Sequence, residues 1–440
     1  MTKAQNQLWI KMRMKKIMVA IRKPTNLHNL VLIAAAFISG LVAVGYAKLF
    51  RFAETISRDL FIQHPLFILF MTPACFLTGW FLVYRYAPQS SGSGIPQIMA
   101  AIEVEEKKDS KIFHKLLGLR VALFKIFSSL LCILGGGAVG REGPTLQISA
   151  SIFYLFGQRF QRYSKIISLD LWILAGSAAG LAAAFNTPLG GIIYGIEELA
   201  RKHFNKIKTI LLWSVVISGL VSQWLVGSYL YLGYPKIGPI QFNEIPAAFL
   251  VGILGGIVGA AFGHYLLIFQ EKFRKNKTTF QLILVTLLSS ALMIGLYFID
   301  HRAFGPGNHF MAEILSGETA ANIQLVVVRF FSAFFSYLSG CAGGIFAPSL
   351  ALGASLGSWI ATFWQGLNPT IFALFGMTAV LTGVTRAPVT SFVLILEMTD
   401  RHNAIFFMMV TAMVALASSQ IFGHESFYEK TKKKFLVTQQ

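Results

Sequence analysis

The chain has 440 residues, of which 55% are hydrophobic and only 13% are charged, and its mean hydropathy is +0.62. A composition this apolar excludes an ordinary soluble protein of this length and predicts an integral membrane protein. The formal net charge of +19 does not indicate a nucleic-acid binder, because the basic residues gather at the termini and in short loops between apolar runs.

Apolar runs that are long enough, or nearly long enough, to cross a bilayer recur along the chain. They lie at about residues 29–50, 65–84, 116–139, 209–233, 245–270, 279–299, 322–338 and 402–422. Shorter runs broken by Gly or Pro lie at 92–104, 142–157, 171–185, 188–199, 346–364, 371–384 and 388–398. Helices that stop part-way across a membrane are tolerated only inside protein or beside a watery cavity. We therefore expect an all-α, multi-pass transporter or channel with several broken helices.

The basic ends of the chain predict its orientation in the cell (inner) membrane. By the positive-inside rule, the N-terminal segment 1–27 and the short tail 422–440 should both be cytoplasmic, which requires an even number of crossings. The N-terminal segment does not have the pattern of a cleavable signal peptide. Cys75, Cys132 and Cys341 lie in apolar runs at unrelated spacing, so we expect core residues there, neither disulfides nor metal ligands.

The chain compared with itself indicates two repeats, at about 28–235 and 245–421. An offset of 204 residues aligns Gly140 with Gly344 and Pro144 with Pro348. An offset of 200 aligns proline 188 with 388 and glutamate 197 with 397, and we expect a structural role for the second glutamate. Paired repeats with broken helices are a known transporter design, often with inverted repeats, although the residues themselves do not show inversion.

Three stretches share one pattern, in which glycine and a few variable residues precede a proline that opens an apolar helix. They are GSGIP at 92–96, GREGP at 140–144 and GGIFAP at 343–348. Helix N-termini carry free N–H groups and partial positive charge, so three that converge would hold a small dehydrated anion. Taken alone, the first stretch is better explained as an ordinary capped helix start.

With these three segments, in this order and spacing, the sequence resembles the CLC family of chloride channels and chloride/proton exchangers from about residue 30 to Tyr428. The resemblance implies that the serine and the phenylalanine of the segments enclose a central anion, completed by a tyrosine beyond the last membrane helix. Tyr428 matches that tyrosine, with Phe427 as the alternative. The implied anion-binding residues are Ser93, Gly94, Ile95, Ile345, Phe346 and Tyr428.

Glu142 resembles the gating glutamate of the family, and its chemistry fits that role. Two unit negative charges about 4 Å apart repel by about 4 kcal/mol at an effective dielectric near 20. An entering anion would therefore favour either protonation of Glu142 or its movement out of the pathway. The structural alternative is a local Arg141–Glu142 pair, and Arg141 is a supporting residue of the site in either case.

Glu197 and Glu198 end the segment AAAFNTPLGGIIYGIEEL at 182–199, which also matches the family. The resemblance implies that Glu198 takes up protons from the cytoplasm, as in the exchangers, with Glu197 supporting it. The alternative is that both carboxylates face the cytoplasm before the basic residues 201–202. Lys125 matches a family lysine that raises the potential for anions.

The leading hypothesis is thus exchange of chloride for protons, and the alternative is a passive gated chloride channel of the same fold. Retention of Ser93 favours chloride over fluoride, and we expect a homodimer with one pathway in each subunit. The family's cytoplasmic regulatory domains are not expected after residue 422. A membrane-embedded enzyme is disfavoured because Ser93 has no neighbouring base in the sequence. We expect no cofactor, no nucleic-acid partner and no metal site, because the nine histidines lack ligand spacing and no nucleotide-binding motif is present.

Overall fold

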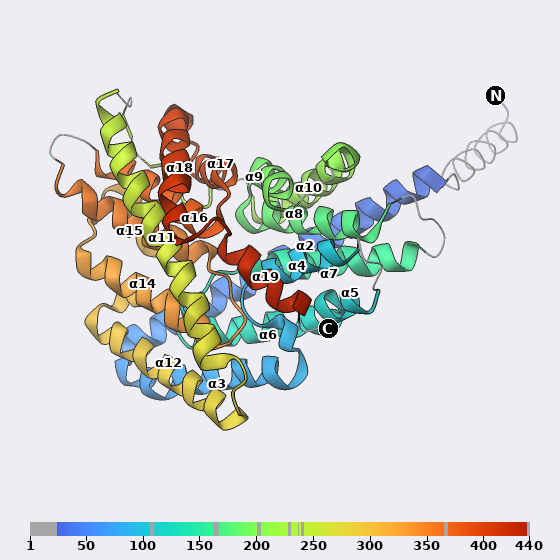
Figure 1. Cartoon of the computed structure of the whole chain (residues 1–440), viewed down its shortest axis with the longest axis horizontal. Coiled ribbons are helices and arrows are strands. Elements are labelled where there is room, and N and C mark those ends of the chain that lie inside the picture. The colour runs from blue at the N-terminus through green and yellow to red at the C-terminus, as the bar shows by residue number, and fades with distance from the viewer. Residues whose placement is uncertain are drawn as a thin grey trace, which may run out of the picture.

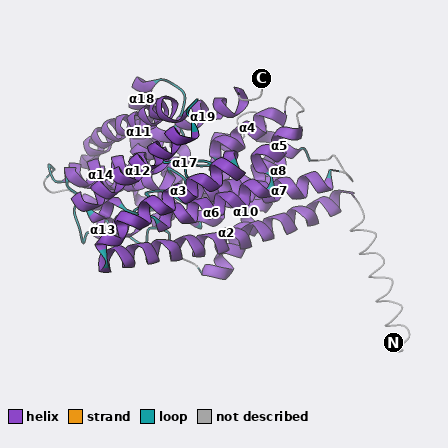
Figure 2. Cartoon of the chain, turned by 90° about the horizontal axis from the view of Figure 1, so that it is seen from below, coloured by secondary structure: helices purple, strands orange, loops and turns teal. Residues whose placement is uncertain are grey.

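The structure is a computed structural model that describes residues 24–105, 110–161, 167–199, 204–227, 230–235, 237–238, 242–364 and 368–437. Helices and connecting loops make up this part of the chain, which confirms the all-helical prediction (Figure 2). Most of the basic segment expected at 1–27 lies outside the described residues, as do the basic residues 201–202.

The first half of the chain runs from one very long helix to the connection at 230–238. Its helices are α2 (Pro24–Gln63), α3 (Ile68–Tyr86), α4 (Ile95–Glu105), α5 (Ser110–Leu117), α6 (Leu119–Leu134), α7 (Glu142–Phe160), α8 (Leu169–Phe185), α9 (Pro188–Tyr194) and α10 (Phe204–Val226). In Figure 1 most of these helices, coloured blue to green, lie on one side of the molecule.

The second half begins with another long helix and ends with a short amphipathic one. Its helices are α11 (Ile245–Arg274), α12 (Thr279–Ile299), α13 (Asn308–Ser316), α14 (Ile323–Leu338), α15 (Phe346–Ala361), α16 (Pro369–Thr385), α17 (Pro388–Thr399), α18 (Ile405–Ser419) and α19 (Phe427–Val437). The terminal α19 packs against α4 of the first half, so the two halves are joined near the centre (Figure 1).

Seven helical stretches in the described part of the chain are long and apolar enough to cross a membrane. They are His28–Gln63, Pro65–Tyr86, Ile112–Leu134, Thr209–Val226, Phe242–Arg274, Thr279–Ile299 and His402–Phe422. The run at 322–338 was expected to be nearly long enough but gives the 16-residue helix α14, which belongs with the shorter apolar helices. These short helices are the broken elements that the interrupted runs predict.

The first apolar run was predicted to end near residue 50, and this boundary is wrong. Helix α2 continues through the charged residues Arg51, Glu54 and Arg58 to Gln63. Its last turns keep an apolar contact of their own, because Phe61 is buried against Tyr297 and Phe304. Burial of this one face holds the helix together after the apolar run has ended.

The innermost helix pairs are α7 with α8 and α15 with α16, and small residues let their backbones approach closely. A methyl group on Gly353 would lie 2.6 Å from the Met377 Cα, and one on Gly376 would lie 2.8 Å from the Gly357 nitrogen. In the first half, a methyl group on Gly180 would lie 2.8 Å from the Ser149 Cβ. Close helix contacts of this kind hold the short helices that carry the site.

The two halves also exchange contacts at the positions related by 200 residues. Glu197 accepts hydrogen bonds from the backbone N–H groups of Val389 (3.0 Å) and Thr390 (2.6 Å), at the start of α17. Glu397 accepts from Leu189 (3.0 Å) and Gly190 (2.8 Å), at the start of α9. Each glutamate therefore satisfies free amides at the helix start of the other half.

Candidate functional site

Three helix starts converge because the loops before them are hydrogen-bonded to one another. The Gly92 N–H donates to the Cys341 carbonyl (3.1 Å), and the Gly343 N–H donates to the Gly92 carbonyl (3.0 Å). Gly140 and Gly344 exchange two backbone hydrogen bonds of 2.7 and 2.8 Å. The loops before α4, α7 and α15 therefore form one unit, although the first and the last of them lie more than 200 residues apart in the sequence.

Each of these helices begins before the proline that was predicted to open it. Helix α4 begins at Ile95, α7 at Glu142 and α15 at Phe346, whereas the prolines are residues 96, 144 and 348. Proline is tolerated through the first turn because the N–H groups there have no partner within the helix. The shift matters for function, because it makes Glu142 and Phe346 the first residues of their helices.

Ser93 lies between two glycines whose backbone conformations have positive φ, 63° at Gly92 and 103° at Gly94. Residues with a side chain rarely adopt these angles, so the glycines define the turn. The Ser93 N–H points at the Tyr337 hydroxyl (3.4 Å), and the Ser93 side chain lies against Gly143, where an added methyl group would collide with its Oγ. Ser93 is thus fixed beside the start of α7.

The Ser93 hydroxyl faces the hydroxyl of Tyr428 in α19. Both groups are buried, and neither makes a hydrogen bond of ordinary geometry within the described residues. Phe427, the alternative to Tyr428, instead packs edge-on against the Tyr337 ring, with 5.7 Å between centroids. Two buried hydroxyls without acceptors are donors available to an anion between them.

Glu142 is 1% exposed and points toward the first turn of α15. Its Oε1 accepts a hydrogen bond from the Tyr231 hydroxyl at 3.2 Å. The backbone N–H groups of Glu142 itself and of Ala347 face the carboxylate, but Oε2 makes no hydrogen bond of ordinary geometry within the described residues. The carboxylate thus occupies a position where helix N-termini favour negative charge.

Arg141 directs its guanidinium to backbone carbonyls, donating to Ala47 (3.0 Å) and Ala184 (3.4 Å). The guanidinium also lies 5.7 Å from the centre of the Tyr231 ring. Arg141 therefore ties the start of α7 to α2 and α8.

Phe346 and Ile345 are both buried at the start of α15. The Phe346 ring lies 5.6 Å from that of Phe185, the last residue of α8. Lys125 in α6 is fully buried, and its Nζ donates to the carbonyls of Gly92 (2.8 Å) and Ser91 (3.4 Å). Lys125 thus holds the loop that presents Ser93 and places a basic group behind it.

Glu198 is buried at the end of a single π-helical turn, Gly195–Leu199, that follows α9. The burial of Glu198 does not fit the alternative in which both carboxylates face the cytoplasm, and Glu197 binds the start of α17. Tyr194 precedes Glu198 by one helical turn, and its buried hydroxyl lies in the electrostatic neighbourhood of Glu198 and Tyr428. Tyr194 is a candidate site residue that lies within the segment 182–199 but was not singled out from the sequence.

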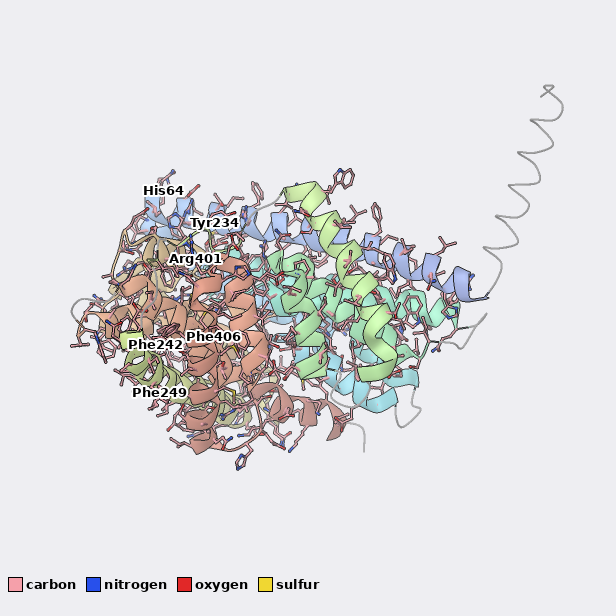
Figure 3. All side chains as sticks on the ribbon, turned by 90° about the horizontal axis from the view of Figure 1, so that it is seen from above. His64, Tyr234, Phe242, Phe249, Arg401 and Phe406 are labelled. Carbon is pink, nitrogen blue, oxygen red and sulfur yellow. The ribbon has the colours of Figure 1, made fainter. Side chains whose placement is uncertain are left out.

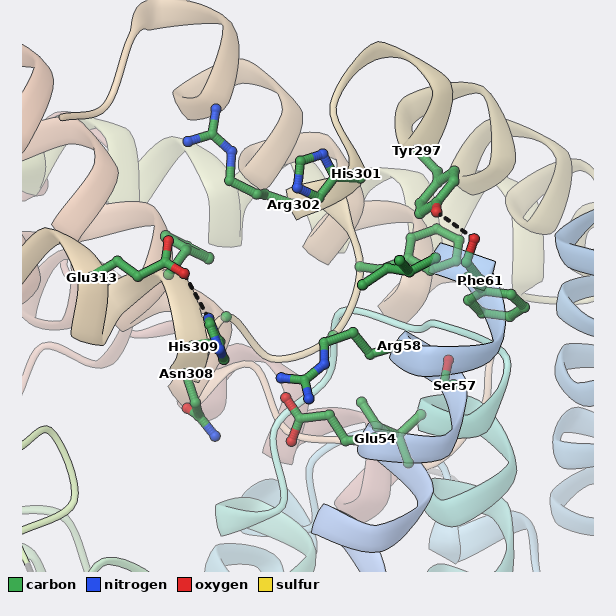
Figure 4. A pocket seen from close by; sticks show the side chains of 16 residues that line it. Glu54, Ser57, Arg58, Phe61, Tyr297, His301, Arg302, Asn308, His309 and Glu313 are labelled. Atoms are coloured by element: carbon green, nitrogen blue, oxygen red, sulfur yellow. Dashed lines mark hydrogen bonds and ion pairs between the residues drawn. The ribbon is translucent and has the colours of Figure 1, made fainter. Parts of the chain in front are cut away.

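A cavity lies between the last turns of α2 and residues 301–313 (Figure 4). We call it the Asn308 cavity, because Asn308 lines it and also lies 3.1 Å from the Tyr231 hydroxyl. At its rim, Arg302 pairs with Asp300 at 2.7 Å. Burial disfavours the ionised form of Asp300, yet the hydrogen bonds and charge of Arg302 outweigh this effect and lower the pKa of the carboxyl.

A family model described as voltage gated chloride channel matches residues 74–420. The chain is 30% identical over 392 residues to the H(+)/Cl(-) exchange transporter ClcA of Vibrio cholerae, covering 85% of this chain and 81% of that protein. It is also 30% identical over 425 residues to ClcA of Citrobacter koseri, covering 91% and 87%.

Two solved structures have a similar fold. A slow cyanobacterial Cl-/H+ antiporter superposes with a TM-score of 0.82 at 25% identity, covering 93% of this chain and 98% of that one. A CLC-type fluoride/proton antiporter superposes with a TM-score of 0.76 at 21% identity, covering 92% and 98%, which shows a shared fold only. The predicted multi-pass membrane fold with broken helices is thereby confirmed.

Proposed function

The chain belongs to the voltage-gated chloride channel (CLC) family, and on that premise we propose that it exchanges chloride for protons. The observation that carries the proposal is the buried Glu142 carboxylate at the convergence of two helix N-termini, next to buried hydroxyls that have no acceptor. A carboxylate and a halide have the same charge and would compete for this place.

The proposed anion site lies between the loop before α4, the start of α15 and Tyr428. The Ser93 and Tyr428 hydroxyls and the first-turn amides would replace the water that the anion loses, since none of these groups carries a full charge. Gly94, Ile95, Ile345 and Phe346 would enclose the anion. Lys125 would support the site by holding the Ser93 loop.

The proposed proton route joins Glu142 to Glu198. The buried Tyr194 hydroxyl lies in the electrostatic neighbourhood of Glu198 and of Tyr428, which in turn faces Ser93. Hydroxyl groups both donate and accept hydrogen bonds, so this row supplies steps for a proton in an otherwise apolar interior. Glu197 would support the route by fixing the π-helical turn that carries Glu198.

Chloride is the proposed anion, because the relatives of 30% identity are named as chloride exchangers and Ser93 is retained. The second candidate is a passive gated chloride channel of the same fold. The burial of Glu198 favours exchange, because an ionisable group inside a membrane is costly to keep and usually has a function there.

Purified protein in liposomes tests the proposal through separate measurements of chloride and proton flux. We expect Glu142→Gln to keep chloride flux while proton flux falls to the level of protein-free liposomes. Glu198→Gln should also lose proton flux, whereas the exposed Glu318→Gln should match the wild type. Proton flux that survives Glu142→Gln would show that Glu142 is not the gate. The absence of proton flux in the wild type would favour the passive channel.

We also propose a homodimer with one pathway in each subunit and both termini in the cytoplasm. The surface carries large exposed apolar side chains on α10 and α18, including Trp224 and Phe406, both 74% exposed. Phe406 lies in the first turn of α18, and its side chain is exposed (Figure 3). Crosslinking in native membranes and the mass of the purified particle test this arrangement, and a monomer in both would contradict it.

A further inference from the structure

We propose that Tyr231, held by Asn308, is a positioning residue that keeps the Glu142 carboxylate inside the anion pathway and thereby weakens chloride binding. This inference rests on the proposed function, because it assigns Tyr231 a role through the proposed gate. Tyr231 lies in the connection between the two halves, and no motif in the sequence includes it.

The position of the Tyr231 hydroxyl is set by four contacts, two of its ring and two of the hydroxyl itself. The ring packs edge-on against Phe185, with 4.9 Å between centroids, and the Arg141 guanidinium lies 5.7 Å from its centre. The hydroxyl oxygen lies 3.2 Å from Glu142 Oε1 and 3.1 Å from Asn308 Oδ1. An aromatic ring with two torsions fixed in this way presents its hydroxyl to the gate with little further loss of entropy.

A tyrosine hydroxyl has one hydrogen, so it cannot donate to both oxygens at once. When Glu142 is ionised, the hydrogen points to the carboxylate, and the Asn308 amide turns its NH2 group toward the hydroxyl oxygen. When Glu142 is protonated, the carboxyl group donates to Tyr231, and Tyr231 donates to Asn308 Oδ1. The pair therefore satisfies the carboxyl group in both protonation states, as long as it stays in this position.

The hydrogen bond exists only while Glu142 is inside the pathway, and an anion that displaces the carboxylate must break it. Hydrogen bonds to charged groups stabilise more than neutral ones do, and even a bond at the weak end of their range corresponds to about a tenfold change in an equilibrium. Chloride competes with the carboxylate, so loss of the hydroxyl should tighten chloride binding by about this factor.

The same contacts make Tyr231 and Asn308 the layer between the gate and the Asn308 cavity. Asn308 is the first residue of α13 and lines the cavity, and in Figure 4 its side chain lies at the cavity's edge beside His309. The other charged or titratable groups that face this region are Tyr46 and Glu54 of α2, Arg141 just before α7, and Arg58, Tyr297, His301, Arg302, His309 and Glu313 around the cavity. The Tyr231 hydroxyl donates directly to the Glu142 carboxylate, so Tyr231 is the side chain whose removal tests the idea.

The test is chloride binding to purified full-length protein by calorimetry at one fixed pH. Tyr231→Phe retains the ring contacts with Phe185 and Arg141, and Tyr234→Phe, an exposed tyrosine of the same connection, is the matched control. We expect Tyr231→Phe to bind chloride about tenfold more tightly and Tyr234→Phe to match the wild type. Asn308→Ala should change binding in the same direction by a smaller factor.

Glu142→Ala provides the background that separates a role through the gate from a general structural effect. In that background, Tyr231→Phe should leave chloride binding unchanged, because the competing carboxylate is gone. Unchanged binding in the single variant Tyr231→Phe, or an equal change in both backgrounds, would overturn the inference. If Glu142→Ala itself neither tightens chloride binding nor loses proton coupling, both the inference on Tyr231 and the proposed function fail.

Discussion

The reciprocal contacts of Glu197 and Glu397 lead to a prediction about stability. Glu197→Ala removes the acceptor of two backbone N–H groups and of the Thr390 hydroxyl (2.7 Å). Val389 is exposed, so its N–H can donate to another acceptor. Thr390 is buried, so its N–H would be left without an acceptor. One unsatisfied buried donor costs about 1–3 kcal/mol, and the lost charge at a helix N-terminus adds about 0.3–1 kcal/mol.

We therefore expect Glu197→Ala to destabilise the protein by about 2–3 kcal/mol, and Glu397→Ala to cost slightly less because it caps two donors. The assay is thermal inactivation in detergent, followed by the monodisperse fraction on gel filtration. Both variants should inactivate several degrees below the wild type, with Glu318→Ala as the exposed control. If both variants are as heat-resistant as the control, these carboxylates do not hold α9 and α17 together.

Three further predictions concern the rim, the anion site and its support. Asp300→Asn should lower stability at neutral pH, because the lowered pKa of Asp300 means that the ionised carboxyl stabilises the fold. In unfolding measurements at graded pH, the difference from the wild type should shrink as the pH falls below about 4 and vanish only below the lowered pKa. Gly143→Ala should weaken chloride binding in calorimetry about tenfold or more, since the new methyl group would lie 2.7 Å from the Ser93 carbonyl oxygen. Lys125→Met should also weaken chloride binding. An unchanged chloride-binding isotherm would show that Lys125 does not support the anion site.

The helix starts of the site could be predicted because their signals are local. Glycines at positive φ and prolines in the first turn act on their own stretch of backbone, so the helix starts beside Ser93, Glu142 and Phe346 could be predicted to within about two residues. Their convergence also depends on backbone bonds between distant loops, such as that between Gly140 and Gly344. Only the matching offset and the resemblance indicated that these loops would meet.

The contacts made by single side chains could not be predicted. Tyr231 reaches Glu142 across 89 residues and Asn308 across 77, and neither pair belongs to a periodic pattern. The partners of Glu197 and Glu397 likewise lie in the opposite half, 192 to 208 residues away. Such contacts arise from the tertiary arrangement of loops and helix ends, which leave no hydrophobic period in the sequence.

Uphill proton movement tests the central claim most directly. Wild-type protein in liposomes is given an outward chloride gradient without a proton gradient, and the internal pH is followed with a trapped dye. The account predicts that chloride efflux drives protons into the liposomes against the gradient that builds up. Chloride efflux with no accompanying change in internal pH would contradict exchange and leave a passive channel.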